Sequence, residues 1–286
     1  MARFLVFGAS GQVGQELCQS PSALPVYRSD VDLTDKSAIK SVFESMHFDA
    51  VVNAAAYTDV ERAETDADLC FKINAEAPKL MAALCAEKNV PFLHISSEFV
   101  FDGKLKRPYT EEDACNPLSV YGQSKFQGEQ NIISSNAAYI ILRTSWVFSK
   151  QQNNFVRKIM RAAQNQRDIQ VVEDQIGAPT AASQISDAIL ALLPTIIADP
   201  ECLGIYHFAS KPNVSRFEFA KEILQMAGLD TVVSPVKSDA FPTTAERPKN
   251  SCLDSTKIFD QFGIEVPDWR VPLKSILSMG TEIDAN

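Results

Sequence analysis

The first half of the chain alternates short apolar, β-rich runs with segments of helical periodicity. The runs predict strands at 3–7, 26–27, 50–53, 91–95 and 139–143. Helical patterns follow at 12–19, 36–46 and 69–88, and another starts near Val120. Strands that alternate with helices form βαβ units, which wind into a parallel sheet. The sequence therefore predicts an α/β fold with a doubly wound parallel sheet.

A glycine-rich turn follows the first predicted strand directly, with the sequence Gly8-Ala9-Ser10-Gly11-Gln12-Val13-Gly14. Without side chains, the chain can turn tightly, approach a pyrophosphate closely and pack a helix against a strand. The spacing is G-x-x-G-x-x-G, and an ordinary glycine-rich turn is the alternative. Its place between a strand and a helix favours dinucleotide binding. The predicted contacts here are Gly8, Ser10, Gly11, Gln12, Val13 and Gly14.

The end of the second predicted strand carries Arg28 and Ser29, about twenty residues after the first glycine. NAD-binding folds place an acid there to bind the ribose 2′-hydroxyl, whereas a guanidinium and a hydroxyl suit a 2′-phosphate. NADPH is therefore the predicted cofactor. NADH stays possible because Asp30 is adjacent, and an exposed loop arginine explains Arg28 about as well. Further cofactor contacts are expected from Asp32, Leu33, Ala54, Ala55 and Ala56.

Three polar residues are expected at the nicotinamide end of such a site. Ser97 ends the fourth predicted strand, and Tyr121 and Lys125 lie one helical turn apart on one face of the next helix. An adjacent ammonium lowers the pKa of a phenol, which would make Tyr121 a usable acid. A tyrosine–lysine pair alone is more typical of a surface. Together with the serine and the glycine turn, it predicts a catalytic set.

Composition excludes several classes of function. The net charge is −9 and basic residues do not cluster, which argues against nucleic-acid binding. No run of 18 apolar residues or signal-peptide pattern occurs, so we expect neither a membrane span nor secretion. Six cysteines and three histidines lack metal-ligand spacing. We therefore expect reduced thiols in a cytoplasmic protein, histidines with structural roles, and no metal site.

The second half of the chain follows the alternating pattern less strictly. We expect an NAD(P)-binding Rossmann domain over 1–148 and a mainly substrate-binding region over 149–286, some of whose segments return to the first domain. Prolines concentrate near the C-terminus and predict an irregular region against the carboxyl edge of the sheet. The polar segment 280–286 is expected to fray.

Across almost its whole length, the chain resembles the extended short-chain dehydrogenase/reductases and, within them, the dTDP-4-dehydrorhamnose reductases. The motifs that carry the resemblance are FGASGQVG (7–14), VNAAAYT (52–58), VFDG (100–103), PLSVYGQSK (117–125), RTSWVF (143–148), DQIGAPT (174–180) and RPKNS (247–251). The resemblance implies reduction of the 4-keto group of a dTDP-4-dehydro-6-deoxy sugar, giving dTDP-L-rhamnose. A role in polysaccharide biosynthesis follows from the family alone.

The resemblance also implies roles for individual residues. Ser97, Tyr121 and Lys125 look like the catalytic triad, and Asn74 like its support. Lys125 would also hold the ribose. The residues implied to bind the sugar nucleotide are Thr58, Ser97, Glu98, Trp146 and Arg247. A homodimer is possible.

The chain departs from the family pattern in two places. Family members usually carry Ser-Thr-Asp-Tyr where this chain has Ser96-Ser97-Glu98-Phe99, which leaves the exact sugar open. Because no second carboxylate follows Glu98, dehydration is disfavoured. Some relatives bind magnesium between subunits, but Ser183 replaces one expected ligand although Glu16 remains. The main alternative is a non-catalytic NADP-binding subunit that resembles the regulatory β subunit of methionine adenosyltransferase.

Overall fold

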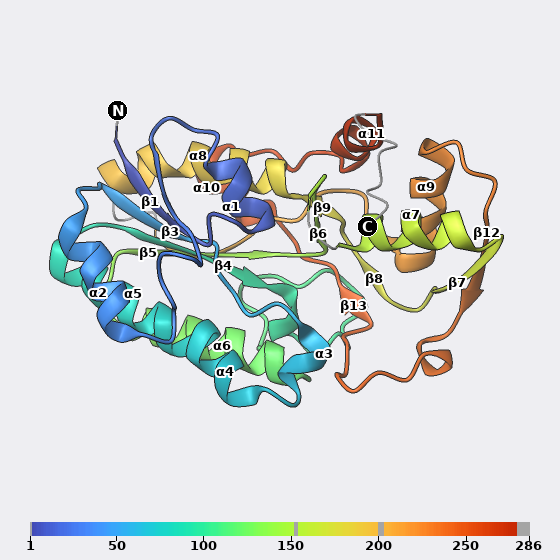
Figure 1. Ribbon diagram of the computed structural model, residues 1–286, viewed down its shortest axis with the longest axis horizontal. Coiled ribbons are helices and arrows are strands. Elements are labelled where there is room, and N and C mark those ends of the chain that lie inside the picture. The colour runs from blue at the N-terminus through green and yellow to red at the C-terminus, as the bar shows by residue number, and fades with distance from the viewer. Residues whose placement is uncertain (1, 152–153, 200–202, 279–286) are drawn as a thin grey trace.

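The computed structural model describes residues 2–151, 154–199 and 203–278. A six-stranded sheet, parallel at every pairing, forms the larger part of the molecule (Figure 1). The strands, in spatial order, are β10 (Gly204–His207), β5 (Tyr139–Thr144), β4 (Phe92–Ser97), β3 (Ala50–Asn53), β1 (Phe4–Phe7) and β2 (Ala23–Val26). The α/β fold is thus confirmed, with one strand more than the first half supplies.

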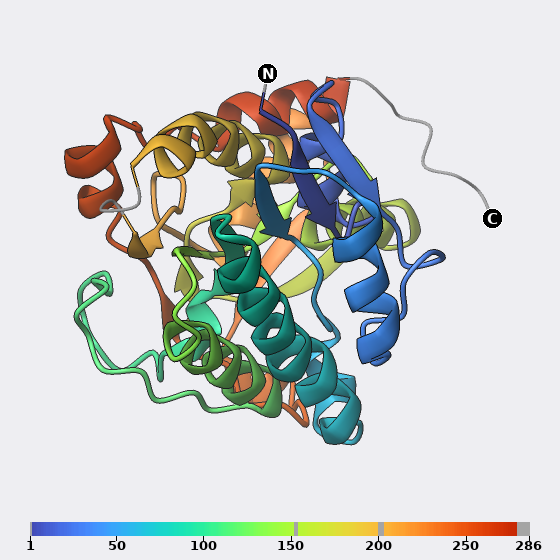
Figure 2. The same ribbon diagram turned by 90° about the vertical axis from the view of Figure 1, so that its left-hand side faces the viewer.

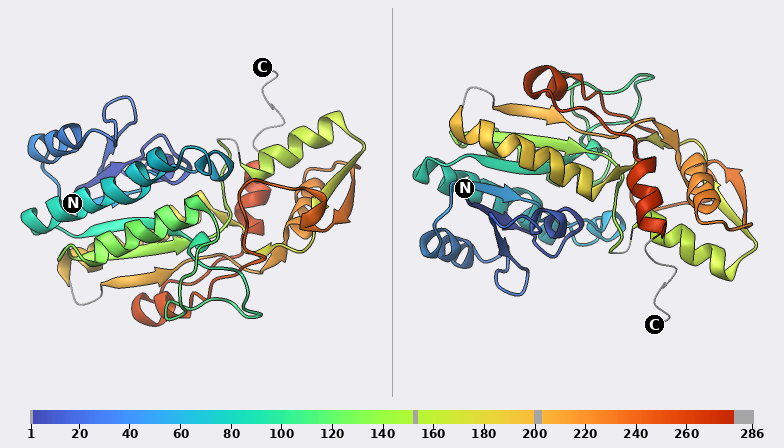
Figure 3. Two further views of the ribbon diagram at one scale, coloured as in Figure 1. Left: turned by 90° about the horizontal axis from the view of Figure 1, so that it is seen from below. Right: turned by 90° about the horizontal axis from the view of Figure 1, so that it is seen from above.

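Helices cover both faces of this sheet. One face carries α1 (Gln12–Leu17), α8 (Ala182–Ala198) and α10 (Thr256–Phe262), while the other carries α2 (Lys36–Ser45), α5 (Ala77–Lys88) and α6 (Val120–Ile133). Figure 3 views the molecule from these two sides, with α5 and α6 in front on the left and α8 in front on the right. Strand residues are buried because each face has its own apolar cluster, as parallel sheets require.

The helix expected over 69–88 is interrupted. The structure has α3 (Val60–Ala63), α4 (Ala67–Phe71) and a π-helical segment (Lys72–Glu76) before α5. Asn74, inside the π-helical segment, is 1% exposed, and its amide bonds the backbone of Tyr57 and the hydroxyl of Ser124. A Cβ on Gly128 of α6 would lie 2.2 Å from the Asn74 carbonyl oxygen. Close packing of α6 here accompanies the local change of helical period.

A smaller α/β part adjoins the carboxyl edge of the sheet, on the right of Figure 1. Its helices are α7 (Phe155–Asn165), α9 (Arg216–Met226) and α11 (Arg270–Ser278), and its strands are β6 (Val147–Phe148), β7 (Asp168–Val172), β8 (Ile176–Gly177), β9 (Thr180–Ala181), β11 (Val214–Ser215), β12 (Val232–Val236) and β13 (Asn250–Ser251). The proline-rich end is more regular than expected, because Pro235 lies in β12, an edge strand paired only with β7, and Pro272 lies in the first turn of α11. Proline is tolerated at both places. The expected frayed tail lies outside the described residues.

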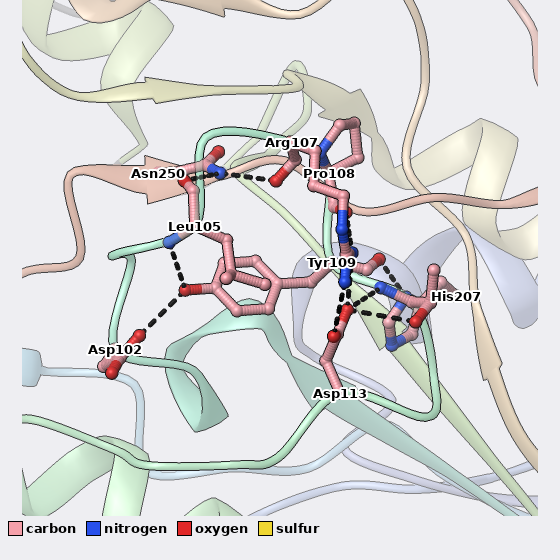
Figure 4. Close-up of polar contacts among 9 residues, drawn as sticks. Asp102, Leu105, Arg107, Pro108, Tyr109, Asp113, His207 and Asn250 are labelled. Atoms are coloured by element: carbon pink, nitrogen blue, oxygen red, sulfur yellow. Dashed lines mark hydrogen bonds and ion pairs between the residues drawn. The ribbon is translucent and has the colours of Figure 1, made fainter.

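The loop between β4 and α6 begins with the short 3₁₀ helix η2 (Glu98–Val100) and projects at the outer edge of the molecule, at the lower left of Figure 2. Figure 4 shows how it is held. Arg107 donates two 2.7 Å hydrogen bonds to the Asp113 carboxylate, and the Tyr109 hydroxyl donates to Asp102 at 2.8 Å. The ring of His207 and the amide of Asn250 contact its backbone, so β10 and β13 fix the loop from the far half of the chain.

Within the described parts of the chain, no helix is long and apolar enough to cross a membrane.

Candidate active site

The carboxyl ends of the central strands open into a cleft of about 1850 Å³, lined by residues from both halves of the chain. Open α/β sheets bind ligands at this edge. Every residue predicted for the cofactor, the sugar nucleotide or catalysis lines the cleft except Gly14 and Ser29. Thr58, Leu33, Ala54 and Ala56 line it without a further contact that defines their role.

The glycine turn is shaped so that only glycine fits. Gly8 has φ +81°, and a Cβ there would lie 2.5 Å from the backbone nitrogen of Ala55. A Cβ on Gly14 would lie 2.0 Å from the carbonyl oxygen of Gly8, so Gly14 allows the packing rather than lining the cleft. No side chain caps α1 at Gly11. The turn therefore forms a cradle of backbone groups that fits a dinucleotide phosphate.

The residues expected at the adenosine end differ in their surroundings. Arg28 lines the cleft at the end of β2, whereas the Ser29 hydroxyl donates to Asp30. Asp32 lines the cleft and accepts hydrogen bonds from the backbone and hydroxyl of Thr34, which lower the pKa of its carboxyl. The amide oxygen of Gln12 accepts from Ser149 and Asn154, so this side chain ties α1 to the start of α7.

The three residues of the predicted catalytic set meet at the end of β4. Ser119 caps α6 by accepting from the backbone of Gly122. A Cβ on Gly122 would lie 2.3 Å from the carbonyl oxygen of Phe99, so α6 packs directly on η2. This packing brings Tyr121 within hydrogen-bonding contact of Ser97, with the Phe99 ring edge-on to the phenol at a centroid distance of 5.3 Å.

The electrostatics of Tyr121 differ from the expectation. Burial and the Glu98 charge raise the pKa of the Tyr121 phenol, although the hydrogen bond with Ser97 opposes them. The groups that shift this pKa do not include Lys125, whose Nζ donates to the Ile95 carbonyl at 2.7 Å and lies 3.1 Å from the His94 ring. Burial lowers the pKa of Lys125 to about 8. Tyr121 is therefore a protonated phenol at neutral pH, the form that donates a proton.

Glu98 lies beside this set, and its carboxylate is 3% exposed. The Ser97 hydroxyl donates to it at 2.7 Å. Burial raises the pKa of Glu98 to about 7, against opposing contributions from this hydrogen bond, from the Arg216 charge and from the backbone of Trp146. Buried carboxyls near neutral pKa are frequent at functional sites.

Trp146 is held between Arg216 and Gly177. The Arg216 guanidinium stacks 3.5 Å from its ring centroid, and a Cβ on Gly177 would lie 2.5 Å from the indole Cε2 atom. Trp146 also has φ +47°, a conformation that costs energy in a bulky residue and is enriched at functional sites. The indole therefore has a fixed position at the cleft.

Arg247, predicted to contact the sugar nucleotide, lines the cleft but pairs with Glu61 of α3 at 2.5 Å. The second oxygen of Glu61 accepts from the backbone nitrogens of Thr244 and Ala245. The loop over 243–247 is thus fastened across the cleft to the first half of the chain.

Sequence reasoning missed several residues of the site. His94, for which a structural role is expected, contacts Lys125, and Arg216, which the sequence did not single out, lines the cleft. Their partners are remote in sequence, so no local spacing indicates them. The buried hydroxyls of Ser96 and Thr144 also line the cleft and have no hydrogen-bond partner among the residues that the structure describes, as expected where a polar ligand binds. Among the described residues no group of three metal-ligating side chains is present.

Comparison with known proteins shows the family of the chain. The family model described as the RmlD substrate binding domain matches residues 2–281. The dTDP-4-dehydrorhamnose reductase of Aggregatibacter actinomycetemcomitans is 38% identical, covering 96% of this chain and 98% of its own. A dTDP-4-dehydrorhamnose reductase structure from Clostridium acetobutylicum has a TM-score of 0.92 at 32% identity, covering 97% of this chain and 99% of that one. One from Bacillus anthracis, in complex with NADP, has a TM-score of 0.91 at 31% identity, covering 98% and 99%. The chain belongs to the dTDP-4-dehydrorhamnose reductase family.

Proposed function

We propose that this protein uses NADPH to reduce the 4-keto group of dTDP-6-deoxy-L-lyxo-4-hexulose, giving dTDP-L-rhamnose. The observation that carries the proposal is the meeting of Ser97, Tyr121 and Lys125 in one cleft with the glycine turn. Full-length relatives named for this activity support it. The first half of the chain would hold the cofactor and the second half most of the sugar nucleotide.

When bound, NADPH supplies the hydride. Tyr121 donates its phenolic proton to the substrate oxygen. Its raised pKa keeps the phenol protonated until this step. Ser97 turns its hydroxyl from Glu98 to donate to the same oxygen, and so orients it. Lys125 binds the ribose hydroxyls beside the phenol. The glycine turn holds the pyrophosphate, and Arg28 the 2′-phosphate.

The sugar nucleotide has a defined set of contacts in this proposal. The fixed indole of Trp146 forms an apolar wall, while Glu98 accepts a hydrogen bond from a sugar hydroxyl. Thr58 and Arg247 contact the rest of the nucleotide, and for this Arg247 exchanges its bond with Glu61 for one with the ligand. A homodimer stays a prediction.

The alternative of a non-catalytic NADP-binding subunit is disfavoured by the intact set of Ser97, Tyr121 and Lys125. The test is oxidation of NADPH by the purified protein when dTDP-6-deoxy-L-lyxo-4-hexulose is added, with the product identified by mass and NMR. We expect dTDP-L-rhamnose in proportion to the NADPH consumed. Tight NADPH binding without any reduction of this sugar would instead support the regulatory subunit or another 4-keto sugar.

A further inference from the structure

A chain of hydrogen bonds crosses the sheet beneath the site and ends on Lys125. The backbone nitrogen of Ala55 donates to Asn53 Oδ1 at 3.0 Å, and Asn53 Nδ2 lies 3.1 Å from His94 Nδ1. His94 Nε2 lies 3.1 Å from Lys125 Nζ, which donates to the Ile95 carbonyl at 2.7 Å. Asn53, His94 and Lys125 are each at most 1% exposed, so water does not supply alternative hydrogen-bond partners to their side chains.

The direction of each bond follows from its first donor. Because Ala55 donates to Asn53 Oδ1, the amide turns its NH₂ group toward His94. The Nδ1 atom of His94 must then accept, which places the proton of the neutral ring on Nε2. That N–H points at Lys125 Nζ. An ammonium there could only donate, so its N–H would face the N–H of His94 with no acceptor between them. A neutral amine accepts this hydrogen bond through its lone pair.

The surroundings of Lys125 favour the neutral amine more than water does. Burial holds the pKa of His94 well below its ordinary value, so the ring carries no charge. Burial also lowers the pKa of Lys125, although Glu129 of α6 and Cys70 of α4 oppose this. The Glu129 carboxylate is already paired with the Arg143 guanidinium at 2.6 Å.

We propose that His94 is a positioning residue that favours the neutral amine form of Lys125 in the cofactor-free protein, and that at mildly alkaline pH Lys125 takes up a proton when NADPH binds. The second step rests on the proposed contact between Lys125 and the ribose. There the hydroxyl oxygens are acceptors, which favour the ammonium and draw Nζ away from the His94 N–H. The charge that stabilises the Tyr121 phenolate after proton transfer would thus be held more firmly on the cofactor-loaded enzyme than on the cofactor-free protein.

Proton uptake can be counted directly. NADPH is titrated into the substrate-free protein by calorimetry at about pH 9, in buffers of different ionisation enthalpy. Because the pKa of Lys125 in the cofactor-free protein is about 8, most of its side chains are neutral at pH 9. We therefore expect uptake of roughly one proton per bound NADPH. In parallel, NMR of protein with isotope-labelled lysine should show one side chain, absent in Lys125→Met, that titrates well below the other lysines before cofactor is added.

Two variants change which group donates and which accepts in these hydrogen bonds. In Asn53→Asp, the carboxylate accepts from both Ala55 and His94, so the ring proton moves to Nδ1 and Nε2 becomes an acceptor for an ammonium. In His94→Gln, the ring N–H is removed and an amide oxygen is available to Lys125. We expect both variants to raise the pKa of Lys125 and to take up clearly less proton than the wild type. His47→Gln, which changes an exposed histidine outside the chain, should behave as wild type.

The outcomes separate this inference from the assigned reaction. Wild-type protein that binds NADPH and reduces the sugar, yet takes up no proton and shows no low-titrating lysine, would overturn the inference and leave the reductase intact. Unchanged uptake in folded Asn53→Asp and His94→Gln proteins would also overturn it. If one variant does not fold, the other and the NMR titration of the wild type still decide.

Discussion

Tyr121 is the proton donor in the proposed reaction. Its buried phenol is protonated because burial and the Glu98 charge raise its pKa. In Tyr121→Phe only a hydroxyl is lost, so folding and NADPH affinity should persist. Turnover should fall at least 10²-fold, as is typical for loss of a general acid. Steady-state kinetics with calorimetric NADPH binding checks this, and a near-normal kcat would refute the assigned role.

In the proposed function, Arg28 binds the 2′-phosphate and so distinguishes NADPH from NADH. In Arg28→Asp, attraction to the 2′-phosphate becomes repulsion, and a charge-assisted hydrogen bond is worth about 1.5–3 kcal/mol. The affinity for NADPH should therefore drop at least tenfold while that for NADH changes little. Equal losses for both cofactors would show that Arg28 supports the fold instead. Lys36→Asp, on nearby α2, is the charge-matched control.

Glu98 makes the stability of the protein depend on pH. Its pKa is about 7 in the folded protein and 4.5 in an exposed chain, so the folded state binds more protons between these values. Stability should then fall as the pH rises from 4.5 to 7 and stay low above it. Glu98→Gln has no carboxyl to titrate. Its free energy of unfolding should therefore rise by about 3 kcal/mol relative to that of the wild type when the pH is raised from 4 to 8. Urea unfolding measures the difference, with exposed Glu87→Gln as control.

The sequence predicted those site residues that lie at the end of a strand or are spaced by one helical turn. Ser97, Tyr121 and Lys125 are of this kind, and all three line the cleft. Arg216 and His94 could not be recognised, since their roles depend on packing between α9 and the 145–146 turn and on pairing between β3 and β4. The reversed pKa shift of Tyr121 also depends on burial, which spacing alone does not give.

Among the elements, β8 has a specific effect on the site because Gly177 faces the Trp146 indole. Gly177→Ala inserts a methyl group that forces the ring to move, and such overpacking typically costs 1–3 kcal/mol. We expect the KM for the dTDP-sugar to rise about tenfold, while NADPH affinity stays within about twofold. Kinetics and calorimetry separate the two.

The control for this change is Gly228→Asn at the end of α9, where no atom lies within 4 Å of an added Cβ and asparagine tolerates positive φ. An unchanged KM in folded Gly177→Ala would mean that Trp146 does not contact the sugar.

Most predicted strands and helices of the first half agree with the structure to within two residues, because their apolar periods are strong. The second strand is an exception: β2 spans Ala23–Val26 and shares only Val26 with the predicted 26–27, because its pairing with β1 rather than a local period defines it. The helix predicted over 69–88 is another, since the π-helical segment is formed by contacts of Asn74 with α6 that a local pattern does not contain. The short strands β8, β9 and β13 have two residues each and no period to recognise.

At the scale of the whole molecule, the sheet needs both halves of the chain. β10 pairs with β5, and α8 and α10 cover one face of the sheet. A fragment over 1–148 lacks all three elements, leaving an open β5 edge and an uncovered apolar face. We expect it to aggregate or to stay partly unfolded and to bind no NADPH. Circular dichroism and light scattering test this, and a monomeric fragment that binds NADPH would contradict it.

The late return of β10 and α10 has a consequence for biosynthesis. A ribosome has translated most of the chain before Thr256–Phe262 emerges, and elongation at about 5–20 residues per second leaves the incomplete sheet exposed for many seconds. Helical packing on one face and pairing along one edge are both absent during that interval. The nascent chain therefore exposes an apolar sheet face and an unpaired strand edge that favour aggregation. Chaperones that shield apolar surface should raise the yield of folded protein. This gain should be larger than for a protein whose nucleotide-binding fold is complete at its N-terminal end.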